Sequence, residues 1–258
     1  MRILLPPSEA KSLGGRGRPR ARRPAGAALG APRATVLDAL GTLVHGDPDV
    51  AANALALPPG IAAQALAANA AVTDSPTTPA LRRYTGVLYA AFGFSGLTPP
   101  AQRVAARSVL VFSGLFGVLR GDEPVPLYRV PAKAVLPGLG IAGTFWRAAL
   151  RDVMPAMLGR GLVVDLRSGE YAAMWRPDAR TAGRVLSVRV LSPDQRDGYA
   201  VLSYQSKLAK GHLAAALVSR AAAGQPVDTA EDVAAAWQSC GGIGGDVTAR
   251  MQLDLYTP

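Results

Sequence analysis

Short apolar runs alternate along the chain with longer segments in which apolar residues recur at helical spacing. The short runs predict strands over residues 1–7, 108–112, 185–193, 197–206 and 251–258. The helical spacing predicts helices over residues 34–72, 79–93, 144–158, 207–223 and 229–240. Residues 161–175 have the pattern of a strand, a loop and the start of a helix. Because helices and strands are interleaved, we expect an α/β or α+β protein.

One segment departs from both patterns. Among glycines and prolines, residues 14–33 carry Arg16, Arg18, Arg20, Arg22 and Arg23. Such a segment cannot bury apolar surface, so we expect a flexible loop, whose arginines either contact phosphates or are simply solvated. The rest of the chain shows no internal repeat and no long linker. Residues 1–258 are therefore expected to form a single domain.

A proline-rich turn divides the helical pattern of residues 34–72. The sequence LPPGIAAQAL places Pro58, Pro59, Gly60 and Ile61 between two helical stretches. In a helix-hairpin-helix, such a turn aims backbone N–H groups at a nucleic-acid phosphate. Pro-Gly turns also join helices that only pack against one another. On these residues alone the packing hairpin is favoured, and the nucleic-acid interpretation stays open.

The charge balance is strongly positive. The 258 residues include 28 lysines and arginines against 18 aspartates and glutamates, a formal net charge of +10. This surplus suits a partner rich in phosphate, such as DNA, a nucleotide or an anionic surface. A generally arginine-rich proteome is the alternative, and the frequent alanine, glycine and proline residues would fit it as well.

Histidine and cysteine are too few for the common metal sites. His45 and His212 are the only histidines and Cys240 is the only cysteine, and none has a second such residue at ligand spacing. We therefore expect no bound metal, no other cofactor and an inert Cys240 thiol. A lone cysteine also excludes an internal disulfide. With no signal peptide and no apolar run of about 20 residues, the protein is expected to be cytoplasmic, without a membrane partner.

Polar residues gather where the predicted strands end. The candidates for an anion or phosphate site follow three of the strands or begin the helix at 207: Ser8, Lys11, Ser113, Gly114, Arg120, Tyr128, Arg129, Ser168, Glu170, Tyr171, Lys207 and Lys210. Ligands of open α/β sheets bind beyond the strand ends, where hydroxyls, glycine backbone and cations together suit an anion. In an enzyme, Lys11 and Glu170 would be the catalytic groups, with Glu170 as a general base.

Each of these residues also has a structural interpretation. Ser-Gly after a strand is often only a turn, and Arg120 could pair with Asp122 or Glu123. The chain contains no Ser-His-Asp order, no Walker loop and no G-x-G-x-x-G motif. A site is therefore expected from the number of polar residues at successive strand ends, and not from a known catalytic motif.

Several stretches, in order along the chain, resemble motifs of one known family. They are MRILLPPSEAKSLGG, FSGLFGVLR, the Tyr-Arg of PLYR, LRSGEYAAMW and SKLAKG. The corresponding family motifs are a first strand followed by Ser-Pro-Ala-Lys, then Leu-Ser-Gly-Leu-Tyr-Gly-Val-Leu-Arg, Pro-Tyr-Arg, Leu-Ala-Ser-x-Glu-Tyr and Lys-Lys-Ala-Arg-Gly. On these motifs the chain resembles the YaaA peroxide-stress protein family, with Glu9 in place of the usual proline and a reduced hairpin region.

The resemblance implies a single-domain α/β fold, with a mixed sheet, flanking helices, a basic cleft, a helix-hairpin-helix and DNA binding. Members of the family limit free iron, and so oxidative damage to DNA, during hydrogen peroxide stress. Our first hypothesis is therefore a cytoplasmic, DNA-binding protein of the peroxide response. The alternative is an enzyme with a pocket for a nucleotide or another small anion at the strand ends, as in a biosynthetic paralogue. A pocket would favour the enzyme, and a groove as wide as a duplex would favour DNA.

Overall fold

The central sheet contains both parallel and antiparallel strands. A computed structural model describes residues 1–16, 27–194 and 198–258. Five strands run parallel to their neighbours: β1 (Arg2–Leu5), β3 (Val109–Ser113), β8 (Val163–Asp165), β9 (Val185–Asp194) and β12 (Gln252–Tyr256). Antiparallel strands close the two edges, β4 (Gly117–Arg120) and β11 (Gly244–Ala249), and β10 (Gly198–Ala200) pairs with β9. The order is β11-β12-β9-β8-β1-β3-β4, which confirms the α/β class and the mixed sheet.

Two small ribbons lie outside this sheet. They are formed by β2 (Thr78–Pro79) with β5 (Pro124–Val125), and by β6 (Val135–Leu136) with β7 (Gly140–Ile141). Both ribbons belong to the segments that connect the central strands to their helices.

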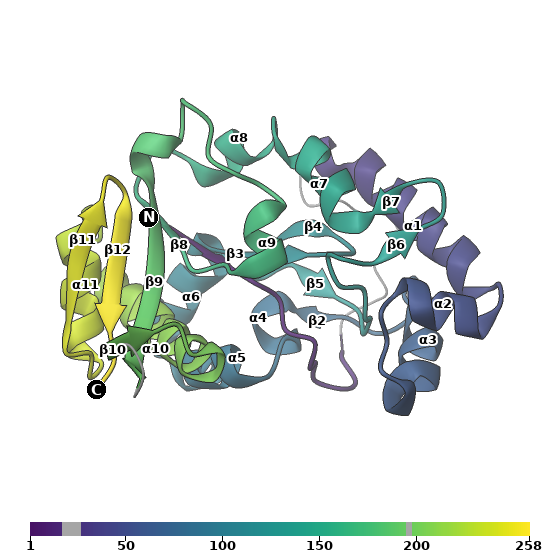
Figure 1. Cartoon of the computed structure of the whole chain (residues 1–258), viewed down its shortest axis with the longest axis horizontal. Coiled ribbons are helices and arrows are strands. Elements are labelled where there is room, and N and C mark those ends of the chain that lie inside the picture. Colours follow the sequence, from purple (N-terminus) through teal and green to yellow (C-terminus); the bar gives the residue numbers. More distant parts are fainter. Residues whose placement is uncertain (17–26, 195–197) are drawn as a thin grey trace.

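Helices flank the sheet (Figure 1). In chain order they are α1 (Gly30–Val44), α2 (Pro48–Ala54), α3 (Ala62–Ala70), α4 (Ala80–Arg83), α5 (Val87–Phe92), α6 (Pro99–Ser108), α7 (Ala142–Leu150), α8 (Met154–Leu158), α9 (Gly169–Ala173), α10 (Ser203–Ala222) and α11 (Ala230–Ser239). Four single turns of 3-10 helix join them, η1 (Ala27–Leu29), η2 (Pro59–Ile61), η3 (Phe94–Gly96) and η4 (Ala182–Arg184). The long α10 packs against α5, α6, α11 and β9, while α7 and α8 lie on the other side of the sheet.

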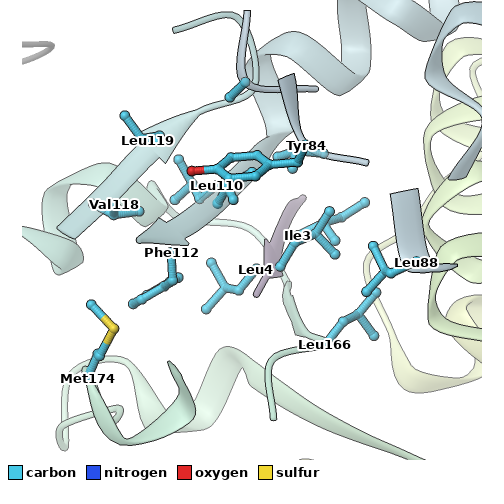
Figure 2. Close-up of a cluster of buried hydrophobic side chains, with 14 of the residues drawn as sticks. Ile3, Leu4, Tyr84, Leu88, Leu110, Phe112, Val118, Leu119, Leu166 and Met174 are labelled. Atoms are coloured by element: carbon cyan, nitrogen blue, oxygen red, sulfur yellow. The ribbon is translucent and has the colours of Figure 1, made fainter. Parts of the chain in front are cut away.

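The core lies where β1 and β3 meet. Ile3 and Leu4 of β1 and Leu110 and Phe112 of β3 are buried on both faces of the sheet, as expected for central parallel strands. Figure 2 shows these side chains in one cluster, which the ring of Tyr84 joins. The ends of these two strands are consequently held by packing on every side.

The structure contains two strands that the sequence did not predict, and one helix that begins inside a predicted strand. The first of these strands, β4, forms a β-hairpin with β3, and Gly117 at its start takes a positive φ of 73° and lies against Trp146. A Cβ at Gly117 would come within 2.5 Å of the Trp146 ring. The glycine-rich β11 was not predicted at all, and residues 203–206 belong to α10, not to a strand.

Two predicted helices are interrupted and one starts early. The helix expected over residues 79–93 breaks between α4 and α5, where Gly86 has a φ of 97° and a Cβ would lie 2.7 Å from Ser8 Oγ. The helix expected over residues 144–158 breaks before Pro155, which has no N–H to continue the ladder. Helix α1 begins at Gly30, inside the segment expected as a loop, and residues 17–26 of that segment lie outside the described residues.

Helix α11 is capped at its N-terminus. Thr229 and Asp232 form a capping box, in which each side chain accepts a hydrogen bond from the other residue's backbone N–H. Within the described ranges, no single helix is long and apolar enough to cross a bilayer. Helix α2 and the segment Pro59–Ala70 reach that length only as a pair, bent by 115°.

Candidate functional site

A pocket of about 430 Å³ opens at the carboxyl ends of β1 and β8. Its walls come from the loop after β1, the loop after β8, residues 128–131, the start of α5 and one side chain of α10. We call this space the strand-end pocket. Its volume lies in the range of small-molecule sites, which is about 300–1,000 Å³.

Eight of the predicted site residues line the strand-end pocket: Ser8, Lys11, Tyr128, Arg129, Ser168, Glu170, Tyr171 and Lys207. They come from four separate parts of the sequence, and the parallel pairing of β1 with β8 brings the first and third strand-end loops together. Glu9, which was not among the predicted site residues, adds a second carboxylate to the wall.

Four predicted residues do not line the pocket. Ser113 is fully buried behind Tyr128, and Gly114 packs against residues 130 and 131, where a Cβ would come within 2.6 Å of the Pro131 oxygen. Lys210 is buried one helical turn beyond Lys207 and donates to the Arg167 carbonyl at 3.4 Å. Arg120 lies at the opposite edge of the sheet, because β4 runs antiparallel to β3, and it pairs there with Asp122 at 3.2 Å.

Lys11 is the most perturbed cation of the pocket. Its Nζ donates to the Ser8 carbonyl at 2.9 Å and lies 4.4 Å from the Tyr128 ring centroid and 5.3 Å from that of Tyr84. Removal from water, followed by the charge of Arg129, lowers the pKa of this amine to about 7. A large fraction of Lys11 is therefore a neutral amine, and so a base and a nucleophile, at neutral pH.

Three hydroxyls form a hydrogen-bonded row beneath Lys11. The hydroxyl of Tyr128 lies 2.6 Å from that of Tyr84 and 2.6 Å from that of Ser113. The Ser113 oxygen also accepts the backbone N–H groups of Leu115 and Phe116. Burial raises the pKa of Tyr128 to about 12 and also raises that of Tyr84 well above its ordinary value, so both phenols are neutral.

Arg129 is fixed through both its backbone and its side chain. The amide of Asn69 in α3 donates to the Arg129 carbonyl at 3.0 Å and accepts the Arg129 N–H at 2.7 Å. The guanidinium pairs with the Glu9 carboxylate. Arg129 thus connects α3 with the loop that follows β1 and presents a positive charge to the pocket.

The loop after β8 carries the acidic group of the pocket. Desolvation, assisted by the negative charge of Glu9, raises the pKa of Glu170 above its usual value although Lys133 opposes the shift. Burial, with Tyr128 and Glu170 nearby, also raises the pKa of Tyr171. Both groups are therefore held more readily in the protonated form than in water.

Two buried arginines hold the loops of the pocket in place. Arg83 is fully buried and donates to four carbonyls, those of Val125 at 2.9 Å, Gly14 at 2.8 Å, Pro76 at 3.0 Å and Ser12. It thereby ties the chain after Lys11 to α4. Arg167 pairs with Asp165 at 2.7 Å and donates to the Tyr171 and Trp175 carbonyls at 3.1 and 3.0 Å, which fixes the loop that carries Glu170.

Sequence reasoning missed Asn69, Arg83, Tyr84 and Arg167 as parts of this site. Asn69, Arg83 and Tyr84 could have been recognised as polar residues on the apolar face of an otherwise apolar segment. Arg167 follows a buried strand directly and could have been included with its neighbour Ser168.

Metal-binding groups do not converge in the part of the chain that the structure describes. No cluster of three histidine, cysteine, aspartate or glutamate side chains is present in residues 1–16, 27–194 and 198–258. The expectation that no metal or other cofactor is bound stays a prediction.

Arginines also collect at the other end of the sheet. Each of the five parallel strands begins with an arginine or has one within the three residues before it, and the antiparallel strand β4 ends with an arginine. In the order of the strands β12, β9, β8, β1, β3 and β4, these residues are Arg250, Arg184, Arg160, Arg2, Arg107 and Arg120. We call them the arginine row. Because neighbouring strands are about 4.8 Å apart, the row extends over roughly 24 Å. Four of its members are exposed, and those before β8 and β3, Arg160 and Arg107, are among them.

The α2–α3 hairpin offers no such charge. Its turn at Pro58, Pro59 and Gly60 is exposed, as a phosphate-binding hairpin requires. Residues 34–81, however, contain neither lysine nor arginine, whereas Asp47 and Asp49 begin α2. The two helices that flank this turn therefore carry no positive charge of their own.

Comparison with known proteins gives a consistent result. Residues 1–236 match the family described as peroxide stress protein YaaA. A UPF0246 protein of Streptomyces coelicolor is 41% identical over 220 residues, which cover 85% of this chain and 83% of that protein. A UPF0246 protein of Corynebacterium efficiens is 34% identical over 85% of this chain and 85% of its own length. A UPF0246 protein of Corynebacterium glutamicum is 34% identical over 93% of this chain and 93% of its own length. The resemblance seen in the sequence motifs is thus confirmed, and the chain belongs to the peroxide stress protein YaaA family, UPF0246.

Proposed function

We propose that this protein acts in the response to hydrogen peroxide by binding a small anionic ligand, of nucleotide or metabolite size, in the strand-end pocket. The convergence of Lys11, Arg129 and Lys207 on a space of about 430 Å³ carries this proposal. The family supplies the process, since its description is that of a peroxide stress protein. The proposed consequence in the cell is less free iron and less iron-driven oxidative damage.

The composition of the pocket favours chemistry on the ligand over simple charge attraction. Two carboxylates, Glu9 and Glu170, share the pocket with its cations, and carboxylates would repel a continuous phosphate backbone. Lys11 has a pKa of about 7, and the pKa of Glu170 is raised by desolvation, so one group is suited to act as a base and the other as an acid. Bound to a single small molecule, the same groups would act as base and acid.

Ligand binding can be tested directly by calorimetry with inorganic phosphate, adenosine monophosphate and pyruvate. At least one of these anions should bind, and Arg129→Ala should weaken it by about tenfold or more, because a charge-assisted hydrogen bond is lost. Arg103→Ala is the matched control, since Arg103 is exposed on α6 and does not line the pocket. Absence of binding for all three anions, or equal weakening by both variants, would refute the pocket proposal.

The cellular role can be tested with a strain that lacks the gene. This strain should be more sensitive to hydrogen peroxide and should contain more free iron, measured by electron paramagnetic resonance of whole cells. The wild-type gene should restore resistance, and the Arg103→Ala gene should do so equally well. Normal peroxide resistance in the deletion strain would contradict the proposed role.

DNA binding is the second candidate, and the arginine row favours it. Its length of roughly 24 Å fits several phosphates of one duplex strand, which carries one charge per about 3.4 Å of helix axis. The exposed arginines of the row could neutralise these phosphates. Binding should weaken with salt by about 0.9 logarithmic units per neutralised phosphate. The double substitution of Arg107 and Arg160 by alanine should reduce that slope by about 2, whereas Lys207→Ala should leave it unchanged. If duplex DNA does not bind at low salt, this candidate fails while the pocket proposal stands.

A further inference from the structure

The position of the Lys11 amine is fixed from several sides, and within the described residues no carboxylate forms an ion pair with it, although Glu9 is near enough to oppose the lowering of its pKa. Its Nζ donates to the Ser8 carbonyl and lies against the Tyr128 ring, and the neighbouring Glu9 carboxylate pairs with Arg129 instead. A structural lysine that served only as a cation would be expected beside a carboxylate. Lys11 instead presents its amine to the strand-end pocket with aromatic rings beneath it.

The protonation of Lys11 suits nucleophilic attack. With a pKa lowered to about 7, about half of the Lys11 amines carry a free electron pair at neutral pH. An ordinary lysine with a pKa of about 10.4 has roughly one such amine in a thousand at pH 7.5. Desolvation and a neighbouring cation, here Arg129, are the two means by which proteins activate a lysine that forms a Schiff base.

The other polar groups of the pocket provide what a carbonyl substrate with an acidic substituent needs. Arg129 and Lys207 are positive charges for a carboxylate or phosphate on the substrate. Glu170, whose carboxyl is held toward its protonated form, is an acid that can donate to an oxygen leaving group. Amine, cations and acid thus come from separate segments and line the same small space.

From this arrangement we propose that Lys11 forms a Schiff base with a small aldehyde or ketone that carries a carboxylate or phosphate group. The inference rests on the anion pocket of the proposed function and adds the class of substrate. The amine electron pair forms a C–N bond to the carbonyl carbon, and the carbonyl oxygen takes up a proton to give a carbinolamine. Nitrogen then loses one proton, and Glu170 protonates the hydroxyl, which leaves as water while the nitrogen electron pair forms the C=N bond. The protonated imine that results is an electron sink for the next step on the bound substrate.

Trapping with cyanoborohydride tests the proposal on the intact wild-type protein. The protein is incubated at pH 7.5 with pyruvate, glyoxylate or glycolaldehyde phosphate and the reductant, and the modified lysines are located by peptide mass spectrometry. Lys11 should be labelled faster than the exposed Lys133 by on the order of tenfold or more, because more of its amine is neutral. Acetaldehyde, which lacks the acidic group, should show a smaller preference for Lys11.

Variants and a binding measurement separate the outcomes. Lys11→Arg keeps the positive charge and should abolish the preferential label, whereas Lys133→Arg should leave it intact. If calorimetry detects pyruvate or phosphate in the pocket but Lys11 is labelled no faster than Lys133 by any of the three probes, the Schiff base is refuted and the anion pocket stands. If no anion binds and no preferential label forms, both proposals fail.

Discussion

Replacing Asn69 by alanine would remove the side chain that holds the backbone of Arg129. Asn69 is 1% exposed, and its amide forms hydrogen bonds of 3.0 and 2.7 Å with the carbonyl and the N–H of Arg129. Alanine would leave both backbone groups without these partners. An unsatisfied buried polar group costs about 1–3 kcal/mol, and water can reach the half-buried side of Arg129, so we expect a loss of about 2–4 kcal/mol in unfolding free energy.

Urea unfolding followed by tryptophan fluorescence measures this loss. In a protein of this size each kcal/mol lowers the melting temperature by about 2–4 °C, so calorimetry should show a fall of about 4–16 °C for Asn69→Ala. Gln64→Ala is the control, because Gln64 is exposed on the same helix and its removal should change stability by less than about 0.5 kcal/mol. Should Asn69→Ala unfold like this control, the two hydrogen bonds would not be what orders Arg129, and the reasoning would be refuted.

Three further substitutions probe the buried charges. Glu123→Ala removes the carboxylate that pairs with the buried Arg33 guanidinium at 2.6 Å, and it should lower the free energy of unfolding by about 3–5 kcal/mol. Asp122→Ala, the control, removes only an exposed ion pair and should lower it by less than about 0.5 kcal/mol. Equal urea midpoints for the two variants would contradict this expectation. Arg83→Met removes the donor of four carbonyl groups and should lower the free energy of unfolding by about 3–5 kcal/mol. Arg83→Lys should recover only part of this lost stability, because an ammonium group cannot bond all four carbonyls at once. The pKa of Lys11 is about 7 in the folded protein against 10.5 ordinarily, so between these values the unfolded chain binds more protons and wild-type stability rises with pH. Lys11→Met should therefore gain most over wild type below pH 7 and lose this advantage as the pH rises to about 10.5; an advantage that stays constant with pH would show that Lys11 titrates normally.

The sequence was sufficient to predict the pocket residues that directly follow parallel strands. Ser8 and Lys11 follow β1, and Ser168 and Glu170 follow β8, and the parallel pairing of the two strands necessarily places both loops at one edge. Arg120 could not be placed in this way, since its location depends on the reversal of direction at Gly117. At Gly117, where β4 begins, the positive φ and the close approach of the Trp146 ring both favour glycine, and Trp146 is distant in the sequence.

The residues that hold the pocket walls in place could not be predicted from their position relative to the ends of strands. Asn69 lies in an alanine-rich helix 60 positions before Arg129, and nothing in the local pattern connects the two. Lys210 and Ser113 have the residue types of ligand-binding groups, yet both are directed into the protein. Lys210 lies one turn of α10 beyond the wall residue Lys207, and Ser113 is the last residue of β3, behind Tyr128. Depth beneath a surface is a property of tertiary packing, and a single sequence does not contain it.

The hydroxyl row beneath Lys11 begins with a hydrogen bond of fixed direction. The Ser113 oxygen already accepts two N–H groups, those of Leu115 and Phe116, so both of its lone pairs are occupied and its proton must point to Tyr128. The Tyr128 oxygen therefore accepts from Ser113, which leaves its own proton available to the Tyr84 oxygen. Burial raises the pKa of both phenols and keeps them neutral. The floor of the pocket is therefore a set of uncharged, hydrogen-bonded hydroxyls, and any change of charge with pH takes place in the groups above it.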